Sequence, residues 1–223
     1  DDNISKEMLP SSLEVLIFEN DYDRPLEIGV LPNSLWKIYF GDCFNQILGS
    51  GVFPISLKKL TLGNSFNQVI NEGVLPPLLH TLIIGDMFNQ IIIPSVLPNS
   101  LHVLQFGKSF NQQLCDNILP KSLQKLYFYG YNHIFLSGSL PSSLKTLYLS
   151  GNFNQKFGQN ILPSSLKSLY LGNSYDQPFS SNVLPEFLQK LRLGNNFNQI
   201  LVQNIIPTNL TELCMYNDNY SYI

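Results

Sequence analysis

Apolar residues recur along the whole chain with a single period. Ten of the fourteen prolines are evenly spaced, 22 residues apart except for one 21-residue step between Pro120 and Pro141. Counted from each of these prolines, apolar residues occupy offsets +3, +6, +8, +12, +16 and +20 in most repeats. One coil cannot bury such a set alone, but stacked coils share it as a continuous core. We therefore predict a repeat solenoid, a single array of about ten coils over residues 1–223.

Offsets +5 to +8 predict the strand of each coil. Residues at +6 and +8 are two apart and are mostly leucine, so the backbone between them is extended and both side chains point to one side. Glycine follows at +9 in six repeats, where the strand must turn. The remaining offsets lie in segments rich in Asn, Gly and Ser, which disfavour a regular α-helix. We expect irregular backbone with short 3₁₀ turns there, so the fold class is mainly β.

A polar ladder stands at offset +13. Asn and Asp tolerate turn geometry and hydrogen-bond nearby backbone groups, and the buried peptide groups of a stacked turn need such partners. We therefore assign this ladder a structural role, with the Gln at +14 in a similar one. Its members are Asn45, Asn67, Asn89, Asn111, Asn132, Asn154 and Asn198, with Asp23 and Asp176 as substitutes.

Composition narrows the class of protein further. The chain has no alanine, which argues against a helical bundle, and a net charge of −3 argues against general nucleic-acid binding. No stretch approaches the ~18 uninterrupted apolar residues that a membrane helix needs, so we expect no membrane partner. Three scattered cysteines are too few for a disulfide framework or a zinc site. They indicate a reducing compartment, and we expect the cytoplasm.

Two sequence motifs resemble known repeat families. Leu-x-x-Leu-x-Leu at +3 to +8 resembles the strand half of leucine-rich repeats. Phe44-Asn45-Gln46-Ile47 and Phe88-Asn89-Gln90-Ile91 are similar to the FNIP repeat of social amoebae and amoeba-infecting giant viruses. The resemblance implies a leucine-rich-repeat-like right-handed coil with one parallel sheet of about ten short strands. It also implies a non-catalytic interaction module, in the host cytoplasm or the virion if the protein is viral.

Residues at +5 and +7 point away from the leucines, onto the outer face of the predicted sheet. Tyrosine and arginine are favoured at binding hot spots, although Tyr also simply suits a sheet surface and Lys protects exposed strands. We single out these residues and one neighbouring tryptophan as a partner-binding surface. They are Trp36, Lys37, Tyr39, Lys59, Lys125, Tyr127, Tyr148, Tyr170, Lys190 and Arg192.

The charges along the chain suggest the kind of partner. Eight of the thirteen basic residues lie at +4, +5 or +7, whereas residues 1–42 carry nine acids and three bases. The sheet face is thus mildly basic behind an acidic N-terminal edge. A protein partner with an acidic surface would be steered to this face.

The sequence shows no set of residues typical of a catalytic site. We find no paired carboxylates, nucleophile–base set or phosphate-binding glycine loop, and expect neither enzyme activity nor a cofactor. His80 and His102 share offset +4 but lack a third ligand, so we expect no metal. His133 lies in the 21-residue repeat, which we expect to bulge and interrupt the surface.

Two hypotheses follow for function. The first is a protein-interaction solenoid, specifically the substrate-recognition part of an F-box/FNIP ubiquitin-ligase receptor, because some FNIP proteins carry an F-box. We recognise no F-box or catalytic domain in this chain, so the ubiquitin-ligase machinery would act through a missing F-box. The alternative is a structural or self-associating repeat protein, for example one that builds particles, without a specific client.

Overall fold

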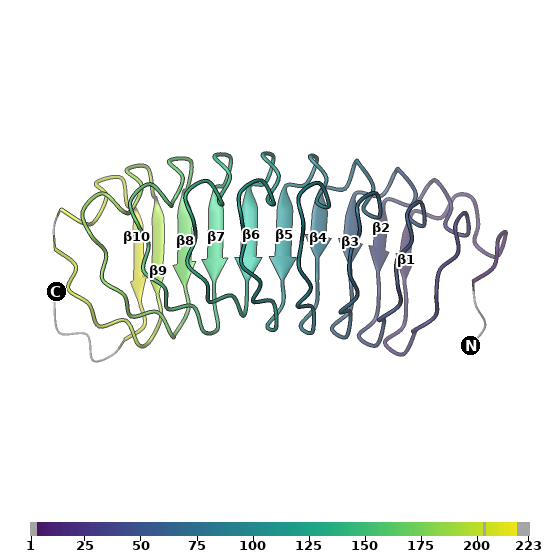
Figure 1. Ribbon diagram of the computed structural model, residues 1–223, viewed down its shortest axis with the longest axis horizontal. Helices are drawn as coiled ribbons and strands as arrows, with labels where there is room; N and C mark the ends of the chain where they lie inside the picture. Colours follow the sequence, from purple (N-terminus) through teal and green to yellow (C-terminus); the bar gives the residue numbers. More distant parts are fainter. Residues whose placement is uncertain (1–3, 203, 218–223) are drawn as a thin grey trace. The chain divides into compact units, whose positions relative to one another are not determined.

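The computed structural model describes residues 4–202 and 204–217, which form ten strands of three or four residues. The strands are β1 (Val15–Ile17), β2 (Lys37–Tyr39), β3 (Lys59–Thr61), β4 (Thr81–Ile83), β5 (Val103–Phe106), β6 (Lys125–Phe128), β7 (Thr146–Leu149), β8 (Ser168–Leu171), β9 (Lys190–Leu193) and β10 (Glu212–Met215). Figure 1 shows that within β1–β5 and within β6–β10 successive strands point the same way and are joined by irregular backbone. Among the described residues, no helix is long and apolar enough to cross a membrane.

The chain folds into two compact units. The N-terminal unit, residues 1–110, contains β1–β5, and the C-terminal unit, residues 111–223, contains β6–β10. Within each unit the strands pair in parallel in chain order, and equal offsets stand opposite each other, as Lys37 stands opposite Lys59. The predicted mainly-β repeat solenoid with ten short parallel strands is confirmed, and the strands occupy the predicted offsets.

The core of each unit consists of the predicted apolar ladders. Leucines at +3 and apolar residues at +6 are fully buried in all but the terminal coils. The aromatic ladder at +12 stacks its rings, and the centroids of Phe44, Phe66 and Phe88 are 6.1 Å apart at each step. Buried Tyr131 and Tyr175 take the place of phenylalanine in the C-terminal unit. Each coil therefore depends on its neighbours for most of its apolar contacts.

Single hydrogen-bonded turns connect the strands. In the first turn the leucine at +3 donates to the proline carbonyl, as Leu57 N does to Pro54 O at 3.1 Å. In the last turn the residue at +19 is left-handed in most coils, as at Gly73 with φ 78° and Asn160 with φ 60°. The described residues thus contain isolated i→i+3 turns and no 3₁₀ helix. Many of the other turn peptides bond to the next coil instead.

Serine and glycine adapt each coil to the one before it. The serine at +2 donates its hydroxyl to the leucine carbonyl of the preceding coil, as Ser56 Oγ does to Leu35 O at 2.7 Å and Ser165 Oγ to Leu144 O at 2.7 Å. At +9 the backbones approach so closely that a Cβ on Gly85 would lie 2.5 Å from Asn64 Cα. No side chain fits such a gap, which explains the glycine ladder.

The asparagine ladder at +13 joins adjacent coils. In the N-terminal unit, Asn67 Oδ1 accepts the Asn89 backbone N–H at 2.9 Å and the Gln90 amide at 3.1 Å. In the C-terminal unit, Asn132 Oδ1 accepts the Asn154 N–H at 3.0 Å, and Asp176 Oδ1 accepts that of Asn198 at 2.8 Å. The partners are thus one repeat away, in the next coil, and Asp serves as well as Asn because only the oxygen is used.

The 21-residue repeat shortens a turn without disturbing the sheet. Lys125 to Phe128 pair in unbroken register with Thr146 to Leu149, so the expected interruption does not occur between β6 and β7. The missing residue lies between the end of β6 and Tyr131, which still fills the aromatic ladder. His133 Nε2 contacts Asn111 O at 2.7 Å, the interaction that Gln makes in other coils. His133 is therefore accounted for by the fold.

Replacing Asn67 tests the polar ladder. Asn67→Ala removes the acceptor for a backbone N–H and an amide, and we expect it to lower the free energy of unfolding by about 1–3 kcal/mol. Asn67→Asp keeps the oxygen and should cost less than half as much. Urea denaturation followed by circular dichroism measures both. Equal losses for the two variants would show that the acceptor oxygen is not what stabilises the stack.

Candidate partner-binding face of the sheet

The N-terminal unit brings together four of the predicted surface residues. Lys37 Nζ lies 4.8 Å from the centroid of the Tyr39 ring and 5.6 Å from that of Trp36. Lys59 Nζ, from the next strand, lies 5.5 Å from the Tyr39 centroid. We call Trp36, Lys37, Tyr39 and Lys59 the Lys–Tyr cluster. It places two ammonium groups around one phenol, and Trp36 remains 39% exposed.

These lysines perturb the phenol. The pKa of Tyr39 is lowered, most strongly by hydrogen bonding from Lys37 and also by Lys59, whereas desolvation by burial raises it. A lowered phenol pKa indicates a positive local potential. The cluster is therefore suited to a negatively charged group.

The C-terminal unit holds the predicted tyrosine row. The ring centroids of Tyr127 and Tyr148, and of Tyr148 and Tyr170, are 6.0 Å apart, and the Arg192 guanidinium lies 5.2 Å from the Tyr170 centroid. Tyr129 joins the row at 5.5 Å from Tyr148, a residue that the sequence analysis missed. Its signal was a tyrosine at the +9 position, where six other coils have glycine. Lys125 begins β6 and is exposed.

The tyrosine row borders a hollow at the ends of the strands. This hollow has a volume of about 460 Å³, and Tyr148, Tyr170, Arg192 and Tyr216 contribute to its walls. Three glycines also line it: Gly151, Gly172 and Gly194. Because these positions carry no side chain, the aromatic rings stand beside bare backbone. The hollow offers ring faces and peptide groups, which suits a peptide segment of a partner protein.

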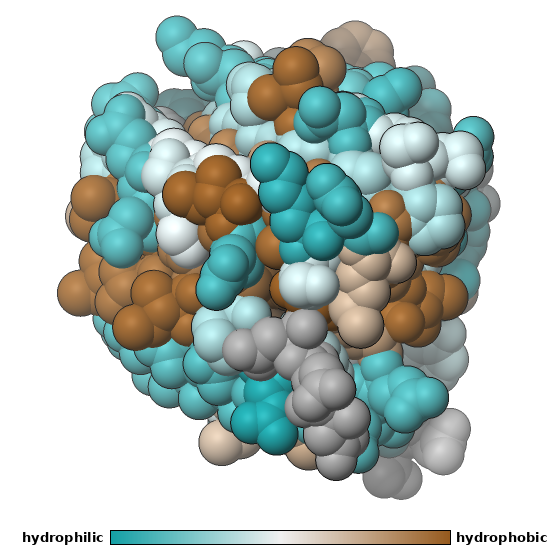
Figure 2. All heavy atoms as spheres, turned by 90° about the vertical axis from the view of Figure 1, so that its right-hand side faces the viewer, coloured by the Kyte–Doolittle hydropathy of each residue, from teal (hydrophilic) through white to brown (hydrophobic). Residues whose placement is uncertain are grey.

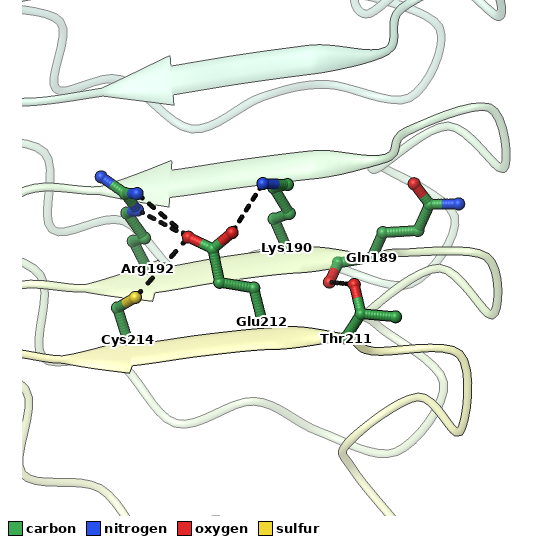
Figure 3. Close-up of polar contacts among 6 residues, drawn as sticks. All are labelled: Gln189, Lys190, Arg192, Thr211, Glu212 and Cys214. Atoms are coloured by element: carbon green, nitrogen blue, oxygen red, sulfur yellow. Dashed lines mark hydrogen bonds and ion pairs between the residues drawn. The ribbon is translucent and has the colours of Figure 1, made fainter.

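Glu212 neutralises the basic end of this row. Figure 3 shows its carboxylate between two side chains of β9: Lys190 Nζ lies 2.6 Å from Oε2 and Arg192 Nη2 lies 3.0 Å from Oε1. Hydrogen bonds from Lys190 and then Arg192 lower the pKa of Glu212 to about 2. The sequence analysis placed Lys190 and Arg192 on the partner-binding surface, and in the structure both are paired with Glu212. The sequence contained a signal for this pairing, because Glu212 at +5 of one coil follows basic residues at +5 and +7 of the coil before it.

His80 and His102 each contact a backbone carbonyl two residues earlier in the chain. The His80 and His102 rings stack with centroids 5.2 Å apart. Each Nδ1 lies close to a backbone carbonyl, Leu78 O at 2.7 Å and Ser100 O at 2.6 Å. Among the described residues, no three His, Cys, Asp or Glu side chains are grouped so that they could hold a metal ion.

Sequence comparison places the repeats in a family. The FNIP Repeat profile matches five consecutive segments, residues 1–43, 44–87, 88–130, 131–174 and 175–218. The chain belongs to the FNIP repeat family. Among curated proteins, none matches this FNIP array in sequence.

Solved structures show the same fold. The FNIP array is 39% identical to CroV588, described as a novel circular LRR protein structure, with a TM-score of 0.85. The match covers 96% of the array but 35% of CroV588, so the array spans about a third of that relative's length. An internalin, InlF of Listeria monocytogenes, is 16% identical with a TM-score of 0.58 over 86% of the array and 57% of its own chain. Human 5T4 is 17% identical with a TM-score of 0.53 over 83% and 77%.

The family fixes the general class of function. Leucine-rich-repeat-like solenoids are generally binding scaffolds for protein partners and are generally non-catalytic. The FNIP array has two separate candidate surfaces, the Lys–Tyr cluster in one unit and the tyrosine row in the other.

A change in pH tests the ion pairs of Glu212. A carboxylate whose pKa is lowered on folding stabilises the fold above its unfolded pKa, near 4.5, and loses this contribution as pH falls toward about 2. We expect Glu212→Gln to lower the thermal midpoint at pH 7, and the difference from the unmodified chain to shrink between pH 4.5 and 2. Glu186→Gln removes a carboxylate without an ion pair among the described residues and is the control. A difference that stays constant with pH would contradict the pairing.

Proposed function

We propose that this FNIP array is a protein-interaction solenoid that binds a protein partner through the outer face of its strands. The observation that carries the proposal is the tyrosine row, in which Tyr127, Tyr148 and Tyr170 repeat at 6.0 Å intervals on a rigid sheet. Aromatic rings on a fixed backbone bind with little loss of conformational entropy. The hollow beside them gives a partner both apolar and polar contacts.

The partner's surface is acidic in this proposal. Lys37 and Lys59 are not neutralised by a carboxylate among the described residues, and Lys125 is exposed. Arg192 lies over Tyr170 and keeps its charge despite pairing with Glu212. Lysines on the face would steer a negatively charged partner and raise its association rate.

The finer form of the proposal concerns the cellular role. We propose that the array is the substrate-recognition part of a ubiquitin-ligase receptor that acts in the cytoplasm. Its support is the family alone, because some FNIP proteins join such repeats to an F-box.

A second candidate is self-association, favoured by the N-terminal end of the array. Figure 2 views this end and shows apolar side chains among polar ones. Met8 and Ile17 are 57% and 69% exposed, and Ile17 lines a hollow of about 640 Å³ together with Leu16, Phe18 and Tyr22. CroV588, the relative with 39% identity, is described as circular. Light scattering separates the candidates, because self-association predicts a mass that rises with concentration.

Removing the tyrosine row tests the leading proposal. The variant replaces Tyr127, Tyr148 and Tyr170 with Ser and Arg192 with Ala, and the control replaces exposed Ile47, Val69 and Ile91 with Ser. With the chain as bait, we expect proteins captured by the unmodified chain and the control to be lost tenfold or more from the variant, because aromatic and Arg anchors dominate interfaces. Quantitative mass spectrometry measures this loss. Equal capture by all three chains would show that the tyrosine row is not the binding site.

A further inference from the structure

The Lys–Tyr cluster contains two like charges held side by side. Lys37 and Lys59 stand opposite each other in the register of β2 and β3, and adjacent strands are about 4.8 Å apart. Both ammonium groups lie within 5.5 Å of the centroid of the Tyr39 ring. Like charges at this separation repel, and a bound anion would relieve that repulsion.

No acidic group among the described residues forms an ion pair with this cluster. In the part of the chain that the structure describes, the ion pairs join Lys108 to Asp86 and Glu212 to Lys190 and Arg192, and none involves Lys37 or Lys59. The two ammonium groups of the cluster are thus available to a ligand that the described residues do not provide.

The C-terminal unit shows how this type of surface holds a carboxylate. There the basic residues at +5 and +7 of β9 bind Glu212, which projects from +5 of the neighbouring strand. Lys190 takes one carboxylate oxygen and Arg192 the other (Figure 3). In β2 the same two offsets carry Lys37 and Tyr39, but the residue at +5 of the next strand is Lys59. Lys59 therefore stands where Glu212 stands in the other unit, so the N-terminal unit has a third donor in place of the carboxylate.

We propose that Lys37, Tyr39 and Lys59 form a binding site for a carboxylate side chain of an acidic protein segment. The two ammonium groups and the phenol would donate to the carboxylate oxygens, in the manner in which Lys190 and Arg192 donate to Glu212. Exposed Trp36 borders the site and gives the neighbouring residue of the segment an apolar surface. The inference rests on the proposed function, since it names where an acidic partner would be anchored.

Trp36 makes the site observable, because it is the single tryptophan of the sequence and lies beside Lys37. The full chain is titrated with a peptide rich in glutamate, and with the glutamine peptide of equal length, at about 10 mM ionic strength, where screening is weak. We expect a saturable change in Trp36 fluorescence with the glutamate peptide alone. Isothermal titration calorimetry provides the dissociation constant without relying on the tryptophan.

Charge-matched variants separate the site from general attraction. Lys37→Gln with Lys59→Gln should raise the dissociation constant tenfold or more. Lys121→Gln with Lys156→Gln removes two exposed lysines outside the strands and should change it less than twofold. Circular dichroism melting confirms that both variants fold. Equal weakening in the two variants, or no response of the unmodified chain, would overturn the site.

The outcome is independent of the tyrosine-row test. That variant changes residues of the C-terminal unit only, so it should bind the glutamate peptide like the unmodified chain. Failure of the peptide experiment removes the carboxylate site while the capture experiment still decides the proposed function.

Discussion

The contact between one coil and the next is the constraint on which the rest of the structure depends. A coil has one strand of three or four residues and otherwise single turns, so most of its polar backbone finds partners only in its neighbours. Asn Oδ1, Ser Oγ and the bare backbone of glycine each serve the same close approach. These residues recur at fixed offsets because every coil meets the same neighbour in the same register.

The repetition explains why so much of the fold could be predicted from the sequence. The apolar run of a single coil is too short to distinguish a strand from other structure. Ten repeats show which offsets are apolar in every coil, and this placed strands such as β2 and β9 at the correct offsets. The left-handed last turns were missed although Gly73 and Asn160 are residue types that favour this conformation, and Ser95 at the same offset lacks that signal. The serine bonds were also missed, since Leu-Pro-x-Ser-Leu looks like a local turn motif whereas its hydroxyl acts on another coil.

The candidate surface was harder to predict than the fold for a related reason. Offsets +5 and +7 identify which side chains share a face, and this held for Tyr148 and Tyr170. Offsets do not show which charges neutralise each other, because that depends on side chains reaching diagonally between strands. Glu212 pairs with Arg192 in this way and neutralises the basic residues of β9, whereas Lys37 and Lys59 have no such carboxylate among the described residues.

The shortened turn after β6 has a consequence for the way such arrays change length. Losing one residue there left strand register, aromatic packing and the polar ladder in place, so the turn is decoupled from the stack. This turn is therefore a position at which a coil can lose a residue, and a foreign loop could be grafted there beside the tyrosines while the scaffold is preserved.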